Sequence, residues 1–210
     1  MSIHAIKRSR YRHRPLVIGL TGSIGMGKSA VAGMLRAEGV PVFDADQVVH
    51  RLQGPDGALL PTIEAAFPGT TGPQGVERAK LGAAVFDDPA ALKKLESIVH
   101  PAVARERERF TRLHRSRRMV VYDIPLLFER TGAASVDIIV VVSAAPWQQR
   151  RRVLRRPAMT ISKFRHILAL QMPDHAKRLR ADFVIDTGQP FDRTRAQVRK
   201  LVGQLRHALA

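Results

Sequence analysis

The sequence contains no cysteine, few aromatic residues and no long apolar run. Without cysteine, disulfides and thiolate chemistry are excluded, which fits a reducing cytoplasm, the location we expect. Only 5% of the residues are aromatic, so the stacking platforms typical of single-strand nucleic-acid binders have few candidates. No apolar run approaches the roughly 20 residues of a membrane-spanning helix, and we expect no membrane partner.

Acidic residues are also scarce. The chain has 35 Lys and Arg against 18 Asp and Glu, which gives a formal net charge of +17. Residues 1–14 hold five cations and no acid, and residues 138–173 hold seven cations and no acid. Such an excess favours anionic partners such as nucleic acid, acidic membranes or polyphosphates. The first stretch lacks apolar periodicity and is predicted to be a disordered basic leader.

One motif dominates the remaining sequence. Residues Gly22–Ser29 read GSIGMGKS, a full match to G-x-x-x-x-G-K-[ST]. The apolar run Leu16–Leu20 before it is typical of a buried strand, and Ala30–Glu38 after it is typical of a helix. In this context the backbone N–H groups and the helix dipole face phosphates, Lys28 reaches the β- and γ-phosphates, and Ser29 binds Mg²⁺. The motif therefore predicts binding of a nucleoside triphosphate.

The rest of the chain alternates strands with helices. Further strands are predicted near 40–43, 119–123, 136–142 and 183–185, with helices between them and a closing helix at 190–208. Asp88-Pro89 predicts a helix start, Thr160 predicts another, and His100-Pro101 predicts a helix break or kink. The predicted fold is α/β: a P-loop NTPase-type parallel five-stranded sheet with helices on both faces, a helical insert and a lid.

Acidic residues follow two of the predicted strands. Ligands gather at the carboxyl ends of parallel strands, and Asp44, Asp46 and Asp123 lie at such ends. A carboxylate there can hold Mg²⁺ or its waters and accept a hydroxyl proton. The alternative for each is a helix cap or a turn, and this alternative is strongest for Asp44.

A basic block runs through residues 148–156. Arg152, Arg155 and Arg156 share one face of the predicted helix and can clamp a transferring phosphoryl group. The alternatives are a solvated face or contacts with nucleic-acid phosphates. The histidines show no metal-ligand spacing, and His100 is either a substrate contact or a packed residue at the helix break.

Taken together, these stretches resemble the bacterial dephospho-coenzyme A kinase family. The matching segments are GLTGSIGMGKS (19–29), VFDAD (42–46), HP (100–101), IPLLFE (124–129), the 149–156 block with Met159-Thr160, Gln171, and ADFVID (181–186). The resemblance implies an enzyme that uses ATP, with Mg²⁺, to phosphorylate the ribose 3′-hydroxyl of dephospho-CoA. It also implies a core at about 15–52, 118–145 and 181–210, a CoA-binding helical insert at about 53–117 and a lid at about 146–180.

The resemblance carries roles to individual residues. Asp46, Lys28 and Arg152 are the expected catalytic residues. The expected magnesium site is Ser29 with Asp46, directly or through water, and Asp123, which is included for its place at a strand end and not because of the resemblance. The implied nucleotide-binding set is Gly22, Ile24, Gly25, Met26, Gly27, Lys28, Ser29, Ala30 and Arg156. The implied substrate contacts are Thr21, His50, His100, Pro125 and Leu126. Some positions depart from the family pattern. Ala30 replaces a common Thr, and His50 replaces a common Arg, so a titratable group stands in place of a fixed cation. Asp123 is not always acidic in the family, which weakens its claim to an essential role.

Other functions fit parts of the pattern. A nucleoside or nucleoside monophosphate kinase shares the core and lid, but it should lack the PLLFE segment and an insert of this size. A nucleic-acid-associated NTPase fits the charge, although no RNA-binding motif is present. We expect dephospho-CoA and ATP as partners and no obligatory nucleic acid. The oligomeric state is left open.

Overall fold

The structure, a computed structural model, describes residue 11 and residues 14–129 and 131–210. The chain divides into two compact units, one within residues 1–43 and 114–210 and the other formed by residues 44–113.

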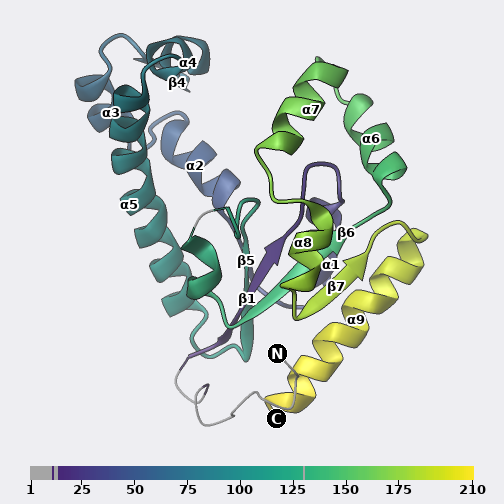
Figure 1. Ribbon diagram of the computed structural model, residues 1–210. Coiled ribbons are helices and arrows are strands. Elements are labelled where there is room, and N and C mark those ends of the chain that lie inside the picture. The colour runs from purple at the N-terminus through teal and green to yellow at the C-terminus, as the bar shows by residue number, and fades with distance from the viewer. Residues whose placement is uncertain (1–10, 12–13, 130) are drawn as a thin grey trace. The chain divides into compact units, whose positions relative to one another are not determined.

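The first unit is built on a five-stranded sheet (Figure 1). The strand order is β2–β5–β1–β6–β7, with β1 (Leu16–Thr21), β2 (Val42–Asp44), β5 (Met119–Asp123), β6 (Ile138–Ser143) and β7 (Phe183–Asp186). Strand β1 runs parallel to both β5 and β6, and β6 runs parallel to β7. All residues of β1 and β5 are buried, as expected of strands covered on both faces. The predicted α/β fold with a parallel five-stranded sheet is confirmed.

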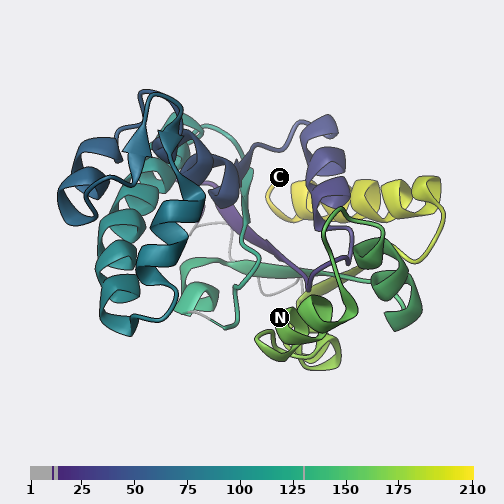
Figure 2. The same ribbon diagram turned by 90° about the horizontal axis from the view of Figure 1, so that it is seen from above.

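Helices cover both faces of this sheet. Helices α1 (Lys28–Ala37) and α9 (Phe191–Ala208) pack together on one face, and α8 (Asp174–Leu179) lies against β6 on the other (Figure 2). Val198, Leu201 and Leu205 recur at helical spacing on α9 and are buried against the sheet. Helices α6 (Pro146–Leu154) and α7 (Ile161–Ala169) pack as a hairpin within the predicted lid. Thr160 caps α7 as predicted, accepting the N–H of Lys163 at 3.2 Å.

The second unit is mostly helical and has a core of its own. It contains α2 (Ala45–Gln53), α3 (Leu60–Ala66), α4 (Arg78–Val85), α5 (Pro89–Leu113) and a short hairpin of β3 (Thr71–Gly72) and β4 (Gly75–Val76). Its core gathers Leu52, Leu59, Ile63, Phe67, Leu81 and Ala102. That the segment at about 53–117 binds CoA stays a prediction.

Of the break or kink expected at His100-Pro101, the break does not occur, because α5 continues through both residues. The helix begins where predicted, with Asp88 accepting the N–H groups of Ala90 and Ala91, but it continues through Pro101 to Leu113. Proline inside a helix costs about 3 kcal/mol because it removes an N–H donor and crowds the preceding turn. Apolar residues on both sides of Pro101, including Ile98 and Val103, pack into one core. These side chains are partly buried and Ala102 is buried, so packing on both sides of the proline offsets the local cost.

Most of the predicted basic leader, residues 1–10 and 12–13, lies outside the described residues. Of the leader cations, Arg14 forms a bidentate pair with Asp137, at 2.6 and 2.7 Å. Asp137 also accepts the N–H of Val17 at 2.9 Å, so this pair fixes the start of β1. In the part of the chain that the structure describes, no helix is both long and apolar enough to cross a membrane.

Candidate functional site

The GSIGMGKS segment forms a tight loop between β1 and α1. Gly25 and Gly27 have positive φ angles of 76° and 86°, a conformation that favours glycine. The N–H of Met26 donates to the carbonyl of Ser23 at 3.1 Å, and the carbonyl of Gly27 accepts the N–H groups of Ala30 and Val31 in α1. The loop thus curls at the N-terminus of a ten-residue helix, an arrangement that favours phosphate binding.

Two glycines of this loop also lie against other backbone and side-chain atoms. A Cβ on Gly25 would approach Val153 Cγ2 to 2.4 Å, and a Cβ on Gly22 would approach the Val142 carbonyl to 2.7 Å. Val153 lies on α6 and is fully buried. The loop therefore needs glycine at position 25 for its turn and its packing against α6, and at position 22 for its packing against β6.

We expect Gly25→Ala to weaken nucleotide binding by at least tenfold and to lower the melting temperature. The left-handed conformation costs about 1–2 kcal/mol for alanine, and overpacking against Val153 adds about 1–3 kcal/mol. Calorimetric titration with ATP and thermal denaturation measure both effects. Gly33→Ala on α1 is the control, since nothing lies within 4 Å of its Cβ position. Unchanged ATP affinity in Gly25→Ala would contradict the assigned loop geometry.

Lys28 and Asp123, two of the residues predicted to bind phosphate and metal, are paired with each other. Lys28 Nζ forms an ion pair with Asp123 Oδ1, and the Asp123 side chain is only 4% exposed. Lysine carries three N–H donors, so Lys28 can keep this partner and still donate to a phosphate. Ser29 is exposed on the first turn of α1, with Ala30 beside it. The hydroxyl of Ser29 and the carboxylate of Asp123 are oxygen donors of the type that Mg²⁺ prefers.

Among the described residues, no three His, Cys, Asp or Glu side chains cluster as metal ligands. A magnesium ion at Ser29 and Asp123 would therefore complete its coordination with nucleotide phosphates and water, as Mg²⁺ commonly does.

Two predicted substrate residues meet beside the loop. The hydroxyl of Thr21, at the end of β1, is fully buried and donates to the carbonyl of Pro125 at 3.1 Å. The N–H of Ile124 donates to Leu20 at 3.0 Å, so the turn after β5 is fixed against β1. Pro125 and Leu126 are half-buried in that turn.

The predicted lid arginines differ in their surroundings. Arg152 donates to the hydroxyl of Thr187 at 3.1 Å and to its carbonyl at 2.7 Å. Thr187 in turn donates to the carbonyl of Met26 at 2.6 Å, which connects α6 to the phosphate loop. Arg156 is exposed. Thr187 was missed by sequence reasoning, because a threonine after a strand carries no chemical signal.

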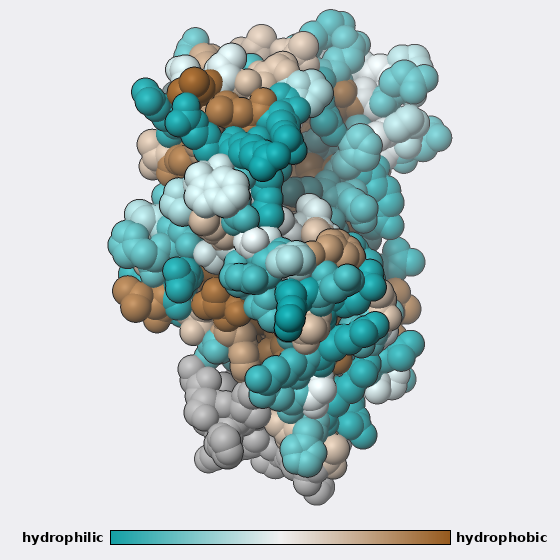
Figure 3. Space-filling model, turned by 90° about the vertical axis from the view of Figure 1, so that its right-hand side faces the viewer, coloured by the Kyte–Doolittle hydropathy of each residue, from teal (hydrophilic) through white to brown (hydrophobic). Residues whose placement is uncertain are grey.

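The outer side of α6 is strongly basic. A hollow of about 250 Å³ is lined by Trp147, Gln148, Arg151, Arg152 and Arg155. Figure 3 shows that hydrophilic side chains cover most of the face that carries α6, α7 and α9. Trp147 on α6 and Phe191 at the start of α9 are exposed apolar side chains. Such a face suits polyphosphate ligands.

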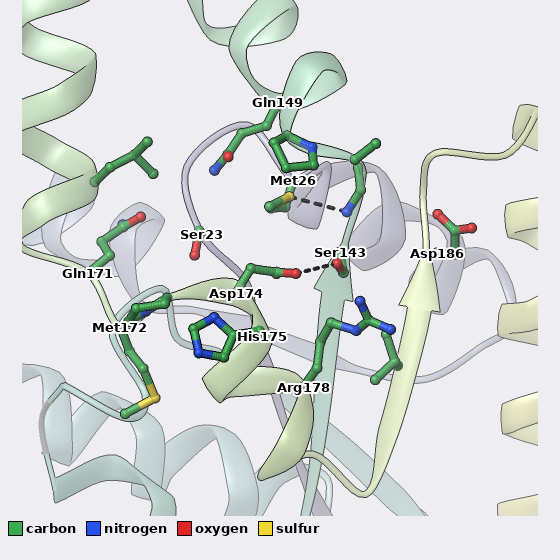
Figure 4. Close-up of a pocket in the computed structure, with 16 residues that line it drawn as sticks. Ser23, Met26, Ser143, Gln149, Gln171, Met172, Asp174, His175, Arg178 and Asp186 are labelled. Atoms are coloured by element: carbon green, nitrogen blue, oxygen red, sulfur yellow. Dashed lines mark hydrogen bonds between the residues drawn. The ribbon is translucent and has the colours of Figure 1, made fainter.

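A larger cavity of about 690 Å³ lies beside the phosphate loop (Figure 4). Its polar lining comes from the loop, β6, α6, α8, β7 and the segment after α7: Ser23, Ser143, Gln149, Gln171, Asp174, His175, Arg178 and Asp186. Asp174 Oδ2 accepts the hydroxyl of Ser143 at 2.7 Å, while its buried Oδ1 has no hydrogen-bond partner among the described residues. The cavity has the size and the mixed lining of a small-molecule site. Sequence reasoning missed it because α8 was not predicted.

A buried ion pair connects the segment after β5 with α8. Lys177 is fully buried, and its Nζ lies 2.8 Å from Glu129 Oε1, which also accepts the N–H of Met172 at 2.8 Å. Burial raises the pKa of Glu129, but the ion pair with Lys177 and the hydrogen bond from the Met172 N–H outweigh it, so the pKa is lowered from 4.5.

The remaining predicted residues belong to the second unit. Asp44 is the N-cap of α2, accepting the N–H of Gln47 at 3.0 Å, and Asp46 is exposed in the first turn. The cap alternative for Asp44 is thus confirmed. His50 is exposed, and its Nδ1 accepts from Arg78 at 2.7 Å, since arginine can only donate. His100 is exposed on α5.

A glycine-rich phosphate loop between β1 and α1 of a parallel sheet, with its lysine paired to a carboxylate at the end of β5, defines a P-loop nucleoside triphosphate-binding protein. The sequence model of the dephospho-CoA kinase family matches residues 16–191, and the chain belongs to that family. A dephospho-CoA kinase from Novosphingobium aromaticivorans is 63% identical over 92% of this chain and 96% of its own length. A dephospho-CoA kinase from Zymomonas mobilis is 50% identical over 90% of this chain and 96% of its own length. The crystal structure of a Thermus thermophilus protein is 33% identical, with a TM-score of 0.78 over 90% of this chain and 96% of its own.

These similarities confirm the resemblance to dephospho-CoA kinases found in the sequence, and they confirm the prediction that the chain is a kinase. They do not test the individual site residues, whose roles stay predictions.

Proposed function

We propose that this chain transfers the γ-phosphoryl group of ATP to the ribose 3′-hydroxyl of dephospho-CoA, giving CoA and ADP in the last step of CoA biosynthesis. The observation that carries the proposal is the phosphate loop with its Lys28–Asp123 pair, in a chain 63% identical to a dephospho-CoA kinase. We also propose a cytoplasmic location, with which the absence of cysteine is consistent.

The loop supplies the nucleotide-binding part of the reaction. Its N–H groups and Lys28 bind the β- and γ-phosphates of ATP, and the positive end of α1 favours their charge. A magnesium ion held by Ser29 and Asp123 would neutralise phosphate charge. Arg152 and Arg156 stabilise the transferring phosphoryl group, for which Arg152 exchanges part of its contact with Thr187.

The acceptor needs a base. We propose that Asp46 accepts the proton of the ribose 3′-hydroxyl as its oxygen forms a bond to the γ-phosphorus. The bond from that phosphorus to the oxygen bridging the β-phosphate breaks, and ADP leaves with the electron pair. Thr21, His50, His100, Pro125 and Leu126 are the proposed contacts for dephospho-CoA.

A coupled ADP-release assay tests this function. Dephospho-CoA, adenosine and AMP are compared as acceptors, RNA is compared as a stimulator, and mass spectrometry identifies the product. We expect selective turnover with dephospho-CoA and formation of CoA. Turnover preferring adenosine or AMP would replace the proposal with a nucleoside or nucleotide kinase. Stimulation by RNA alone would favour a nucleic-acid-associated NTPase, which the net charge of +17 keeps as the second candidate.

A further inference from the structure

One residue of the phosphate loop is held by two glutamines. The N–H of Ile24 donates to Gln171 Oε1 at 3.0 Å, and the carbonyl of Ile24 accepts from Gln149 Nε2 at 2.8 Å. The chemistry fixes both side-chain orientations, because an N–H needs an acceptor and a carbonyl needs a donor. Both backbone polar groups of Ile24 are therefore paired with side chains from outside the loop.

These glutamines come from the two ends of the basic helical hairpin. Gln149 lies on α6 and is 6% exposed, and Gln171 follows the last turn of α7. Figure 4 shows both beside the cavity, approaching the loop from different elements. Between them lie the arginines of the predicted lid and no acidic residue. Both ends of this hairpin are thus bonded to the same residue of the phosphate loop.

The two bonds differ in how a nucleotide would affect them. A phosphate oxygen competes for loop N–H groups, and a hydrogen bond to a charged acceptor is roughly twice as strong as one to a neutral amide. Phosphate can therefore displace Gln171 from the N–H of Ile24. It cannot displace Gln149, because a carbonyl and a phosphate are both acceptors.

We propose that Gln149 and Gln171 are positioning residues that couple the basic hairpin to the phosphate loop. Gln149 is the permanent attachment, and Gln171 is a latch that nucleotide phosphate releases, freeing the α7 end of the hairpin to rearrange. The proposal rests on ATP as the phosphoryl donor of the proposed function, but it does not depend on the identity of the acceptor.

Two variants, Gln149→Met and Gln171→Met, test this coupling, because they should change the Kd for ATP differently. In Gln149→Met, the Ile24 carbonyl loses its donor and the loop loosens, so we expect the Kd for ATP to rise roughly five- to tenfold. In Gln171→Met, the N–H of Ile24 is left free for phosphate. We expect the Kd for ATP to stay equal or fall, while kcat falls roughly tenfold because α7 is no longer coupled to loop occupancy.

Hydrogen–deuterium exchange tests the same coupling without a phosphoryl acceptor in the sample. Without nucleotide, the amides of α7 and residues 170–172 should exchange faster in Gln171→Met than in the wild type, at an unchanged melting temperature. Saturating ADP should produce the same acceleration at residues 170–172 in the wild type. Gln171→Glu retains an acceptor for the Ile24 N–H, so it should restore wild-type exchange without nucleotide while weakening ATP binding through its charge. Gln204→Met, at an exposed position of α9, is the control and should change nothing.

The proposed coupling and the proposed function can fail independently in these experiments. Equal rises in the Kd for ATP in both variants, or wild-type exchange in Gln171→Met, would overturn the latch. Failure of dephospho-CoA as acceptor would remove the proposed function and leave the binding and exchange results interpretable.

Discussion

Replacing Asp46 with asparagine should reduce kcat by roughly 10²–10⁴-fold, the range expected when a general base is lost. Asparagine preserves the size of the side chain but cannot accept the proton of the attacking hydroxyl. The side chain is exposed in the first turn of α2, so the fold should tolerate the change. ATP affinity should stay within about threefold of the wild type, because the loop and Lys28 remain. Steady-state kinetics with dephospho-CoA and calorimetric titration with ATP measure the two effects separately.

Asp44→Asn provides a matched control two residues away. Asp44 caps α2, and asparagine caps helices about as well as aspartate, so both stability and turnover should be close to those of the wild type. Wild-type turnover in Asp46→Asn would remove this carboxylate from the mechanism. Equal losses in both variants would instead indicate damage to α2.

Secondary structure can be predicted best from the sequence where the local preference of the residues and their tertiary packing favour the same element. Strand β5 occurs at Met119–Asp123 as predicted, because a buried apolar run has no competing structure. The caps at Asp88 and Thr160 also occur where predicted, since each is decided within a few residues. Helix α8 was missed because six residues with no side-chain cap carry too little local signal.

The site is less predictable than the fold, because its partners are distant in sequence. The phosphate loop can be read from one continuous motif, yet the attachment of Ile24 to Gln171 spans 147 positions. Similarly, the partner of Lys28 is 95 positions away, and nothing local distinguishes Asp123 from a cap or a turn acid. The passage of α5 through Pro101 is decided by packing on both sides of the proline, which local rules do not include.

Replacing Lys177 with methionine should destabilise the protein by about 3–5 kcal/mol, the cost of leaving one member of a buried ion pair uncompensated. Lys177 is fully buried, so no water replaces its ammonium group beside Glu129. Denaturant unfolding followed by circular dichroism measures the loss. Lys200→Met, at an exposed position of α9, should change stability by less than about 0.5 kcal/mol.

The double variant Lys177→Met/Glu129→Gln separates the buried charge from packing. It removes both charges while glutamine still accepts the Met172 N–H, so much of the lost stability should return. It should also change the acid response. Because the folded pKa of Glu129 lies below 4.5, the pair stabilises the wild type above that pH, and this stability is lost as pH falls through the folded pKa. The double variant should therefore lose less stability than the wild type between pH 7 and pH 3, in unfolding measured across that range. A double variant as unstable as Lys177→Met alone, with the same acid response as the wild type, would show that the methylene packing of Lys177, rather than its charge, holds α8 in place.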